Sequence, residues 1–128
     1  MPDQEKKLLN REYGATMRLG GWDCVIARGT VTEKAYLEAG LIGKSGKAKI
    51  NGRHRHSFEF NNAYRDRLVK AGLVVSGTTP DGKLVEIIEL KNHPFFVGSQ
   101  FHPEFQSRPL SPHPLFAGFM KAVVKNKK

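Results

Sequence analysis

Leu84-Val85-Glu86-Ile87-Ile88-Glu89-Leu90 is the clearest strand in the chain, and it decides the fold class. Its apolar residues are Leu, Val and Ile, and the β-branched side chains among them suit a pleated sheet. The tight turn Thr79-Pro80-Asp81-Gly82 joins it to an apolar strand at residues 73–77. On its other side, Asn92-His93-Pro94 leads into a further strand at residues 95–99. Two hairpin-like connections therefore feed one sheet.

Three helices are predicted around this sheet. Residues 32–40 begin with a candidate N-cap, Thr32, and close with Gly40, which suits the left-handed position after a helix. A second helix follows the cap Asn61-Asn62 and ends before Gly72. The third helix, residues 114–124, has an apolar stripe that we expect to pack in the core: Leu115, Phe116, Phe119, Met120 and Val123. The predicted fold class is α/β, a mixed sheet with flanking helices.

Residues 53–60 alternate in a pattern that predicts a strand with two different faces. One face is expected to carry His54, His56, Phe58 and Phe60, and the other Arg53, Arg55, Ser57 and Glu59. Earlier in the chain, glycines at both ends of residues 14–21 favour a close backbone approach or a sharp turn, and residues 24–27 read as a short strand.

Composition places the chain among globular proteins. It has 128 residues, of which 39% are hydrophobic and 26% charged, and its formal net charge is +9. A single cysteine excludes an internal disulfide, no stretch is apolar enough to span a membrane, and a cytoplasmic location is expected. Residues 1–13 read as a polar segment, 14–124 as one domain portion and 125–128 as a basic tail.

The stretch Gln100-Phe101-His102-Pro103-Glu104-Phe105 carries the candidate chemistry. In extended backbone, His102 and Glu104 leave the chain on the same side, and Pro103 restricts His102 to extended geometry. A carboxylate beside an imidazole can orient the base that takes a proton from a Ser or Cys supplied from elsewhere. The alternative interpretation of the same spacing is a polar strand end with a solvated histidine.

Other candidate sites are weaker. Cys24 lacks the glycine-flanked turn of a nucleophile elbow and is more simply a small buried residue. His54 and His56 lack a third nearby ligand, so a metal site is not expected. Arg53 and Arg55 give some support to nucleic-acid binding, although no recognised binding signature surrounds them.

These motifs, in this order, resemble the C-terminal half of the glutamine amidotransferase domain of CTP synthases. The resemblance runs from about Gly14 to Lys121 and rests on Ala15-Thr16-Met17-Arg18-Leu19-Gly20, Arg53-His54-Arg55-His56, residues 81–89, His93-Pro94-Phe95-Phe96-Val97, residues 100–105 and His113-Pro114-Leu115-Phe116-Ala117-Gly118-Phe119. It implies part of a class I, flavodoxin-like amidotransferase domain. It also implies hydrolysis of L-glutamine to supply ammonia for the ATP-dependent conversion of UTP to CTP in pyrimidine biosynthesis.

The resemblance assigns roles to three residues. His102 would be the general base and Glu104 the carboxylate that orients it, as two members of a Cys-His-Glu triad. Ser57 stands where the family has an arginine that contacts glutamine, which puts that contact in question. The family's nucleophile lies in a Gly-x-Cys-x-Gly elbow that these 128 residues do not contain.

The resemblance also implies what lies outside the chain. We expect a truncated domain, inactive alone, that pairs with the missing N-terminal half or self-associates. ATP and Mg would belong to the missing synthetase domain. The alternatives are a basic nucleic-acid-binding module, whose affinity would fall steeply with salt, and a degenerate subunit that only regulates a partner.

Overall fold

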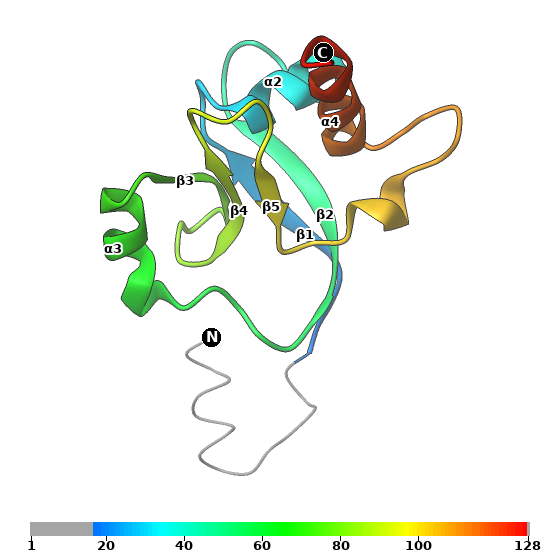
Figure 1. Cartoon of the computed structure of the whole chain (residues 1–128). Coiled ribbons are helices and arrows are strands. Elements are labelled where there is room, and N and C mark those ends of the chain that lie inside the picture. Colours follow the sequence, from blue (N-terminus) through cyan, green and yellow to red (C-terminus); the bar gives the residue numbers. More distant parts are fainter. Residues whose placement is uncertain (1–16, 128) are drawn as a thin grey trace.

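A computed structural model describes residues 17–127 of the chain as one curled sheet with helices around it (Figure 1). The five strands lie in the order β2-β1-β3-β4-β5. Their bounds are β1 Arg18–Ile26, β2 Ala48–His56, β3 Leu73–Thr78, β4 Val85–Leu90 and β5 Val97–Ser99. A strand is present at each predicted place, but β1 is longer than predicted, β2 begins and ends earlier, and β5 is shorter.

Every strand pair among the described residues is antiparallel, whereas we predicted a mixed sheet. Short links explain the antiparallel pairing of β3 with β4 and of β4 with β5, because parallel neighbours need a crossover of a dozen or more residues. The β1–β2 link contains α2 and is long enough for either direction. The predicted tight turn joins β3 to β4, and its Gly82 N–H donates to the Thr79 carbonyl at 2.8 Å. The α/β class with flanking helices is confirmed.

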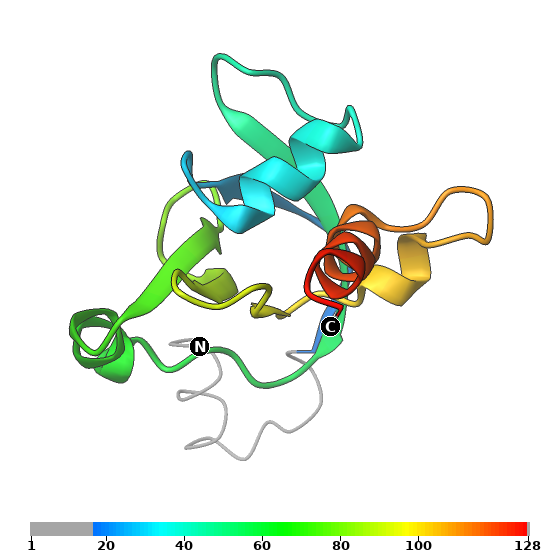
Figure 2. The same cartoon turned by 45° about the horizontal axis from the view of Figure 1, so that its top comes forward.

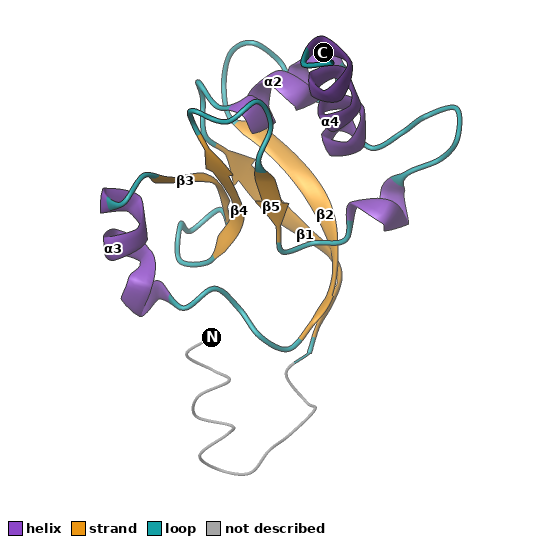
Figure 3. Ribbon diagram, viewed as in Figure 1, coloured by secondary structure: helices purple, strands orange, loops and turns teal. Residues whose placement is uncertain are grey.

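The helices are α2 Val31–Glu38, α3 Arg65–Lys70 and α4 Pro114–Lys125, with short 3-10 helices at Asn62–Tyr64 and Pro103–Gln106. Helices α2 and α4 lie side by side, and α3 lies at the far end of the sheet beside β3 (Figures 1 and 2). Figure 3 shows the loop before α4 extending away from the sheet. None of the helices described here combines the length and apolar character that crossing a lipid bilayer requires. The predicted segment 1–13 lies outside the described residues.

Helix α2 begins two residues earlier than predicted. Thr30 is the N-cap, and its hydroxyl accepts the Glu33 N–H at 3.1 Å. Thr32 is buried instead, and it donates its hydroxyl to the Glu89 carboxylate of β4 at 2.9 Å. The same carboxylate accepts the N–H groups of Val31 and Thr32, which places a negative charge at the positive end of the helix. Glu89 therefore fixes α2 against the sheet.

The predicted core stripe of α4 is largely exposed. Leu115 is buried at 6% exposure, but the other members are 39–56% exposed: Phe116, Phe119, Met120 and Val123. Our prediction of core packing was wrong for these four side chains. The reason is that α2 packs on one flank of α4, where Gly118 approaches Ala35, and Phe95 meets the stripe only edge-on at Phe119. Monomeric soluble proteins rarely leave a large contiguous apolar surface of this kind exposed.

The core lies inside the curl of the sheet and is sensitive to added volume. It is formed by Cys24, Ile26, Tyr36, Ala48, Ile50, Ile87, Phe101 and Leu115. Gly77 borders it in β3, where a Cβ atom would lie 2.8 Å from Ile87 Cγ1 and 2.9 Å from Cys24 Sγ. Both contacts are shorter than side-chain packing allows, so Gly77 provides space that the core needs.

We expect Gly77→Ala to lower the free energy of unfolding by about 1–3 kcal/mol, the usual cost of overpacking a core. Urea unfolding of the two proteins measures this change. Gly43→Ala is the matched control, because its nearest heavy atom would be 3.7 Å away, and it should change stability by less than about 0.5 kcal/mol. Equal effects of the two substitutions would contradict the packing argument.

Candidate catalytic site

His102 lies just beyond β5, where the chain turns into the 3-10 helix Pro103–Gln106. Its backbone is extended, with φ −98° and ψ 96°, as the following proline requires. Glu104 lies in the first turn of the 3-10 helix, so the extended geometry that we predicted for both residues was wrong for Glu104. The turn nevertheless brings the two side chains together.

The imidazole and the carboxylate form a short contact, 2.6 Å between His102 Nδ1 and Glu104 Oε1. This bond holds the pKa of the Glu104 carboxyl below its usual value. An ionised carboxylate can only accept, so Nδ1 is the donor and the neutral imidazole keeps its lone pair on Nε2. Nε2 has no hydrogen-bond partner among residues 17–127, and the His102 side chain is 37% exposed. The arrangement is that of a base available to an incoming group.

The backbone around His102 is anchored to the opposite edge of the sheet. Its N–H donates to the Arg53 carbonyl of β2 at 2.8 Å, which closes the curl beyond β5. The neighbouring Phe101 is buried and packs edge-on against the His54 ring, with centroids 6.0 Å apart. Phe105 stacks on the imidazole itself at 4.8 Å with an interplanar angle of 17°. These contacts fix the position of the ring before any ligand binds.

Ser57 lies directly after β2, in a segment that the structure brings close to the base. Gln100, two residues before His102, donates its side-chain amide to the Phe58 carbonyl at 3.1 Å. This bond holds the segment beside the chain that leads to His102. No hydrogen bond joins Ser57 itself to His102 or Glu104 in the described part of the chain.

Cys24 does not belong to this site. It lies in β1 with its side chain fully buried in the core. Burial raises the pKa of the thiol to about 12, so it stays protonated near neutral pH and cannot act as a thiolate. The three-dimensional structure therefore agrees with the prediction of a small buried residue.

A buried charge cluster is the feature that the sequence interpretation missed. Arg18 contacts Glu59 at 2.8 Å and Glu86 at 2.7 Å, and all three side chains are at most 1% exposed. His54 lies 3.0 Å from Glu86, and His56 lies 2.7 Å from Glu59. The Glu86 oxygens lie at ion-pair distance from Arg18 and His54, but these contacts do not have the angles of hydrogen bonds. Burial alone would raise the pKa of Glu86, yet His54 and Arg18 outweigh it and lower that pKa.

The cluster was missed because the alternation of buried and exposed side chains does not continue beyond the end of β2. The strand ends at His56, so Phe58 is 79% exposed and the Glu59 side chain is buried, opposite to the faces that we predicted. Arg53 and Arg55 share one face of β2, as predicted, and both are exposed. One signal was available: Glu86 lies between apolar residues of β4, and a buried acid needs a cationic partner.

The described residues contain no group of three or more His, Cys, Asp or Glu side chains placed to hold a metal ion. An exposed imidazole, an ionised carboxylate and a fixed backbone are the acid–base groups that a nucleophilic site requires.

Comparison with known proteins identifies the family. The model of the glutamine amidotransferase class-I family matches residues 9–122. The chain belongs to the class-I glutamine amidotransferases. The CTP synthase of Rubrobacter xylanophilus is 54% identical over 97% of this chain, and that of Dehalococcoides mccartyi is 60% identical over 88%. These matches span only 20% and 19% of the respective relatives.

A solved structure supports the same assignment within the amidotransferases. The glutaminase domain of Trypanosoma brucei CTPS, solved with bound acivicin, superposes with a TM-score of 0.74 and 37% sequence identity. The match covers 90% of this chain and 42% of that chain. The predicted resemblance to CTP synthase is thus confirmed, as is the fold class that it implied.

Proposed function

We propose that this amidotransferase chain supplies the base and its orienting carboxylate to the glutaminase site of a CTP synthase. The site would hydrolyse glutamine, and the ammonia would convert UTP to CTP with ATP, in cytoplasmic pyrimidine biosynthesis. The observation that carries the proposal is the 2.6 Å bond from His102 Nδ1 to Glu104, which leaves Nε2 unpartnered among the described residues. ATP and Mg would bind the synthetase domain rather than this chain.

In the proposed reaction, His102 Nε2 takes the proton of a cysteine thiol, and the thiolate attacks the side-chain carbonyl carbon of glutamine. The imidazolium then gives its proton to the departing nitrogen, which leaves as ammonia with a thioester behind. Water, deprotonated by the same imidazole, hydrolyses the thioester to glutamate. Throughout, Glu104 keeps His102 in one tautomer and stabilises its positive charge.

The nucleophilic sulfur has to come from outside these 128 residues. Cys24 is the single cysteine of the sequence, and it is buried and protonated. We propose that it is the Gly-x-Cys-x-Gly elbow of the remaining amidotransferase segment that approaches His102. Ser57 would line the glutamine site, with a hydroxyl where the family places a guanidinium.

The exposed apolar surface of α4 is where we place that remaining segment. A hollow of about 330 Å³ between β5 and α4 is lined mainly by aromatic and aliphatic side chains: Phe95, Phe96, Val97, Ser99, Pro103, Leu115, Phe116 and Phe119. Pro103 makes this hollow continuous with the His102 site. The chain matches 42% of the Trypanosoma brucei glutaminase chain, so most of such a domain remains to cover the surface.

We expect the 128-residue chain alone to release no more ammonia from glutamine than its His102→Ala variant, because the base has no accessible thiol to activate. Coupled detection of ammonia and glutamate measures the rate of each protein. Activity should appear when the chain is co-expressed with a CTP synthase segment that carries the Gly-x-Cys-x-Gly elbow. Glutaminase activity of the chain alone, lost on His102→Ala, would overturn the proposal of an external nucleophile.

A further inference from the structure

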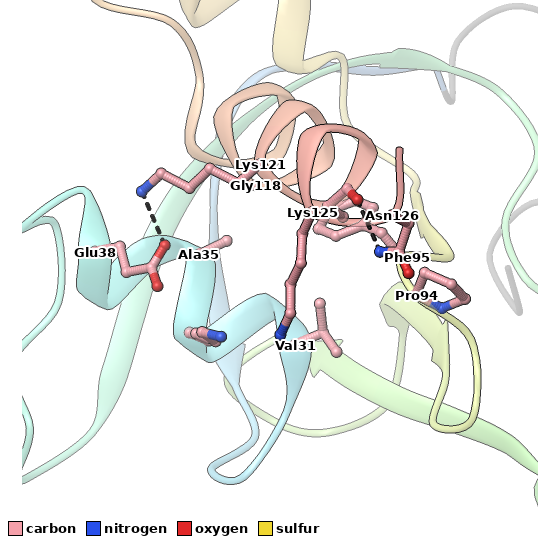
Figure 4. A pocket seen from close by; sticks show the side chains of 11 residues that line it. Val31, Ala35, Glu38, Pro94, Phe95, Gly118, Lys121, Lys125 and Asn126 are labelled. Atoms are coloured by element: carbon pink, nitrogen blue, oxygen red, sulfur yellow. Dashed lines mark hydrogen bonds and ion pairs between the residues drawn. The ribbon is translucent and has the colours of Figure 1, made fainter. Parts of the chain in front are cut away.

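Figure 4 shows a groove between α2 and α4. His102, Glu104 and Ser57 do not line it. Its volume is about 370 Å³, within the range of small-molecule sites. Its walls come from both helices and from the turn at Pro94 and Phe95. The proposed glutaminase chemistry does not use any residue of this groove.

The floor of the groove is apolar and depends on a close approach of the two helices. It consists of Val31, Ala35, Phe95, Gly118 and Ala122. A Cβ atom on Gly118 would lie 3.1 Å from Phe95 Cε2 and 3.2 Å from Ala35 Cβ, so glycine allows α4 to lie directly on these residues. A hydrocarbon group or an aromatic ring could pack on this floor and displace water from it.

The rim of the groove is cationic. Three lysines line it, Lys34, Lys121 and Lys125, against a single carboxylate, Glu38. Glu38 is already bound to Lys121 at 3.0 Å, and this bond lowers the pKa of its carboxyl. Lys34 and Lys125 form no ion pair within residues 17–127, and Lys125 extends from α4 across the groove toward Val31 (Figure 4). An anion between them would therefore meet two ammonium groups, of which Lys34 also acts electrostatically on Glu38.

We propose that this groove binds a small organic anion, in which an apolar or aromatic body carries a carboxylate, sulfonate or phosphate. The body would lie on the Phe95 side of the floor, and the anionic group would lie between Lys34 and Lys125. An inorganic anion is not the expected ligand, because it would leave the apolar floor uncovered and exposed lysines alone hold such ions weakly. The volume argues against a docked protein helix, which is about 10 Å across with its side chains.

The test uses the full 128-residue chain and the aromatic sulfonate 1-anilinonaphthalene-8-sulfonate as the probe. In a ¹H–¹⁵N NMR titration, the amide shifts should be largest in α2 and in the second half of α4, and they should saturate. Lys34→Glu with Lys125→Glu should weaken binding by about tenfold, because each substitution replaces an attractive ammonium group with a repelling carboxylate. Lys70→Glu with Lys91→Glu is the matched control for net charge and should leave the affinity unchanged.

Three results would overturn the site. One is a set of shifts centred on the exposed Phe116 and Phe119 stripe instead of the groove. A second is an equal loss of affinity in the control pair, which would indicate non-specific attraction. The third is binding of inorganic sulfate as tightly as the probe, which would leave no role for the apolar floor. None of these results bears on glutaminase activity, so the two proposals fail independently.

Discussion

Replacing His102 by alanine is expected to lower glutamine-dependent CTP formation by about 10²- to 10⁴-fold and to leave ammonia-dependent formation unchanged. The protein for this test is the Dehalococcoides mccartyi CTP synthase in which the 112 matching residues are exchanged for this chain. The loss follows because thiolate formation and protonation of the departing nitrogen both pass through Nε2. Ammonia added to the medium bypasses both steps.

Glu104→Gln is the graded comparison in the same chimaera. Its side chain can still accept the Nδ1–H bond, but it no longer stabilises the imidazolium by charge. We expect a smaller loss than for His102→Ala, confined again to the glutamine-dependent reaction. Loss of the ammonia-dependent reaction in both variants would indicate damage to folding. A catalytic role for His102 would be contradicted if glutamine remained a full nitrogen donor for the His102→Ala chimaera.

Arg18→Met is expected to destabilise the fold by about 3–5 kcal/mol, the usual cost of removing one partner from a buried ion pair. The guanidinium contacts Glu59 and Glu86, all with side chains at most 1% exposed, and methionine would leave two carboxylates without their cation. The two adjacent histidines can compensate only in part. Urea unfolding at neutral pH measures the difference.

The pH dependence gives this prediction a second readout. Because the pKa of Glu86 is lowered in the folded protein, its ionisation stabilises the fold above the unfolded pKa of about 4.3, and that contribution is lost as the pH falls. The deficit of Arg18→Met should therefore shrink in acid. Lys49→Met is the matched control, since its pair with Asp23 is exposed and should contribute less than about 1 kcal/mol. Equal effects at positions 18 and 49 would contradict a buried network.

Local patterns predicted that the His102 and Glu104 side chains would meet, although a 3-10 turn brings them together and not extended backbone. The spacing of His102, Pro103 and Glu104 placed a base beside a carboxylate, and the structure joins them at 2.6 Å. The hairpin turn before β4 was likewise predictable, since its residues determine its backbone. The resemblance to CTP synthases then gave these residues their proposed roles.

Features that depend on distant contacts were not predictable in the same way. Arg18, Glu59 and Glu86 belong to three separate segments, and only the folded sheet brings their charges together. The stripe on α4 has the same helical period whether it faces its own core or another segment, so periodicity could not reveal its exposure.

The hydrogen bond from the His102 N–H to the Arg53 carbonyl has a consequence for folding kinetics. It joins the two edges of the sheet, β2 and the end of β5, which are far apart in the chain. Contacts of long sequence separation form late, because chain entropy is lost before they stabilise the fold. On a ribosome, β2 emerges well before its partner, so the His102 ring reaches its final position only after the segment that follows β5 has been synthesised. We therefore expect the geometry of the His102 site to be among the last features of this fold to form.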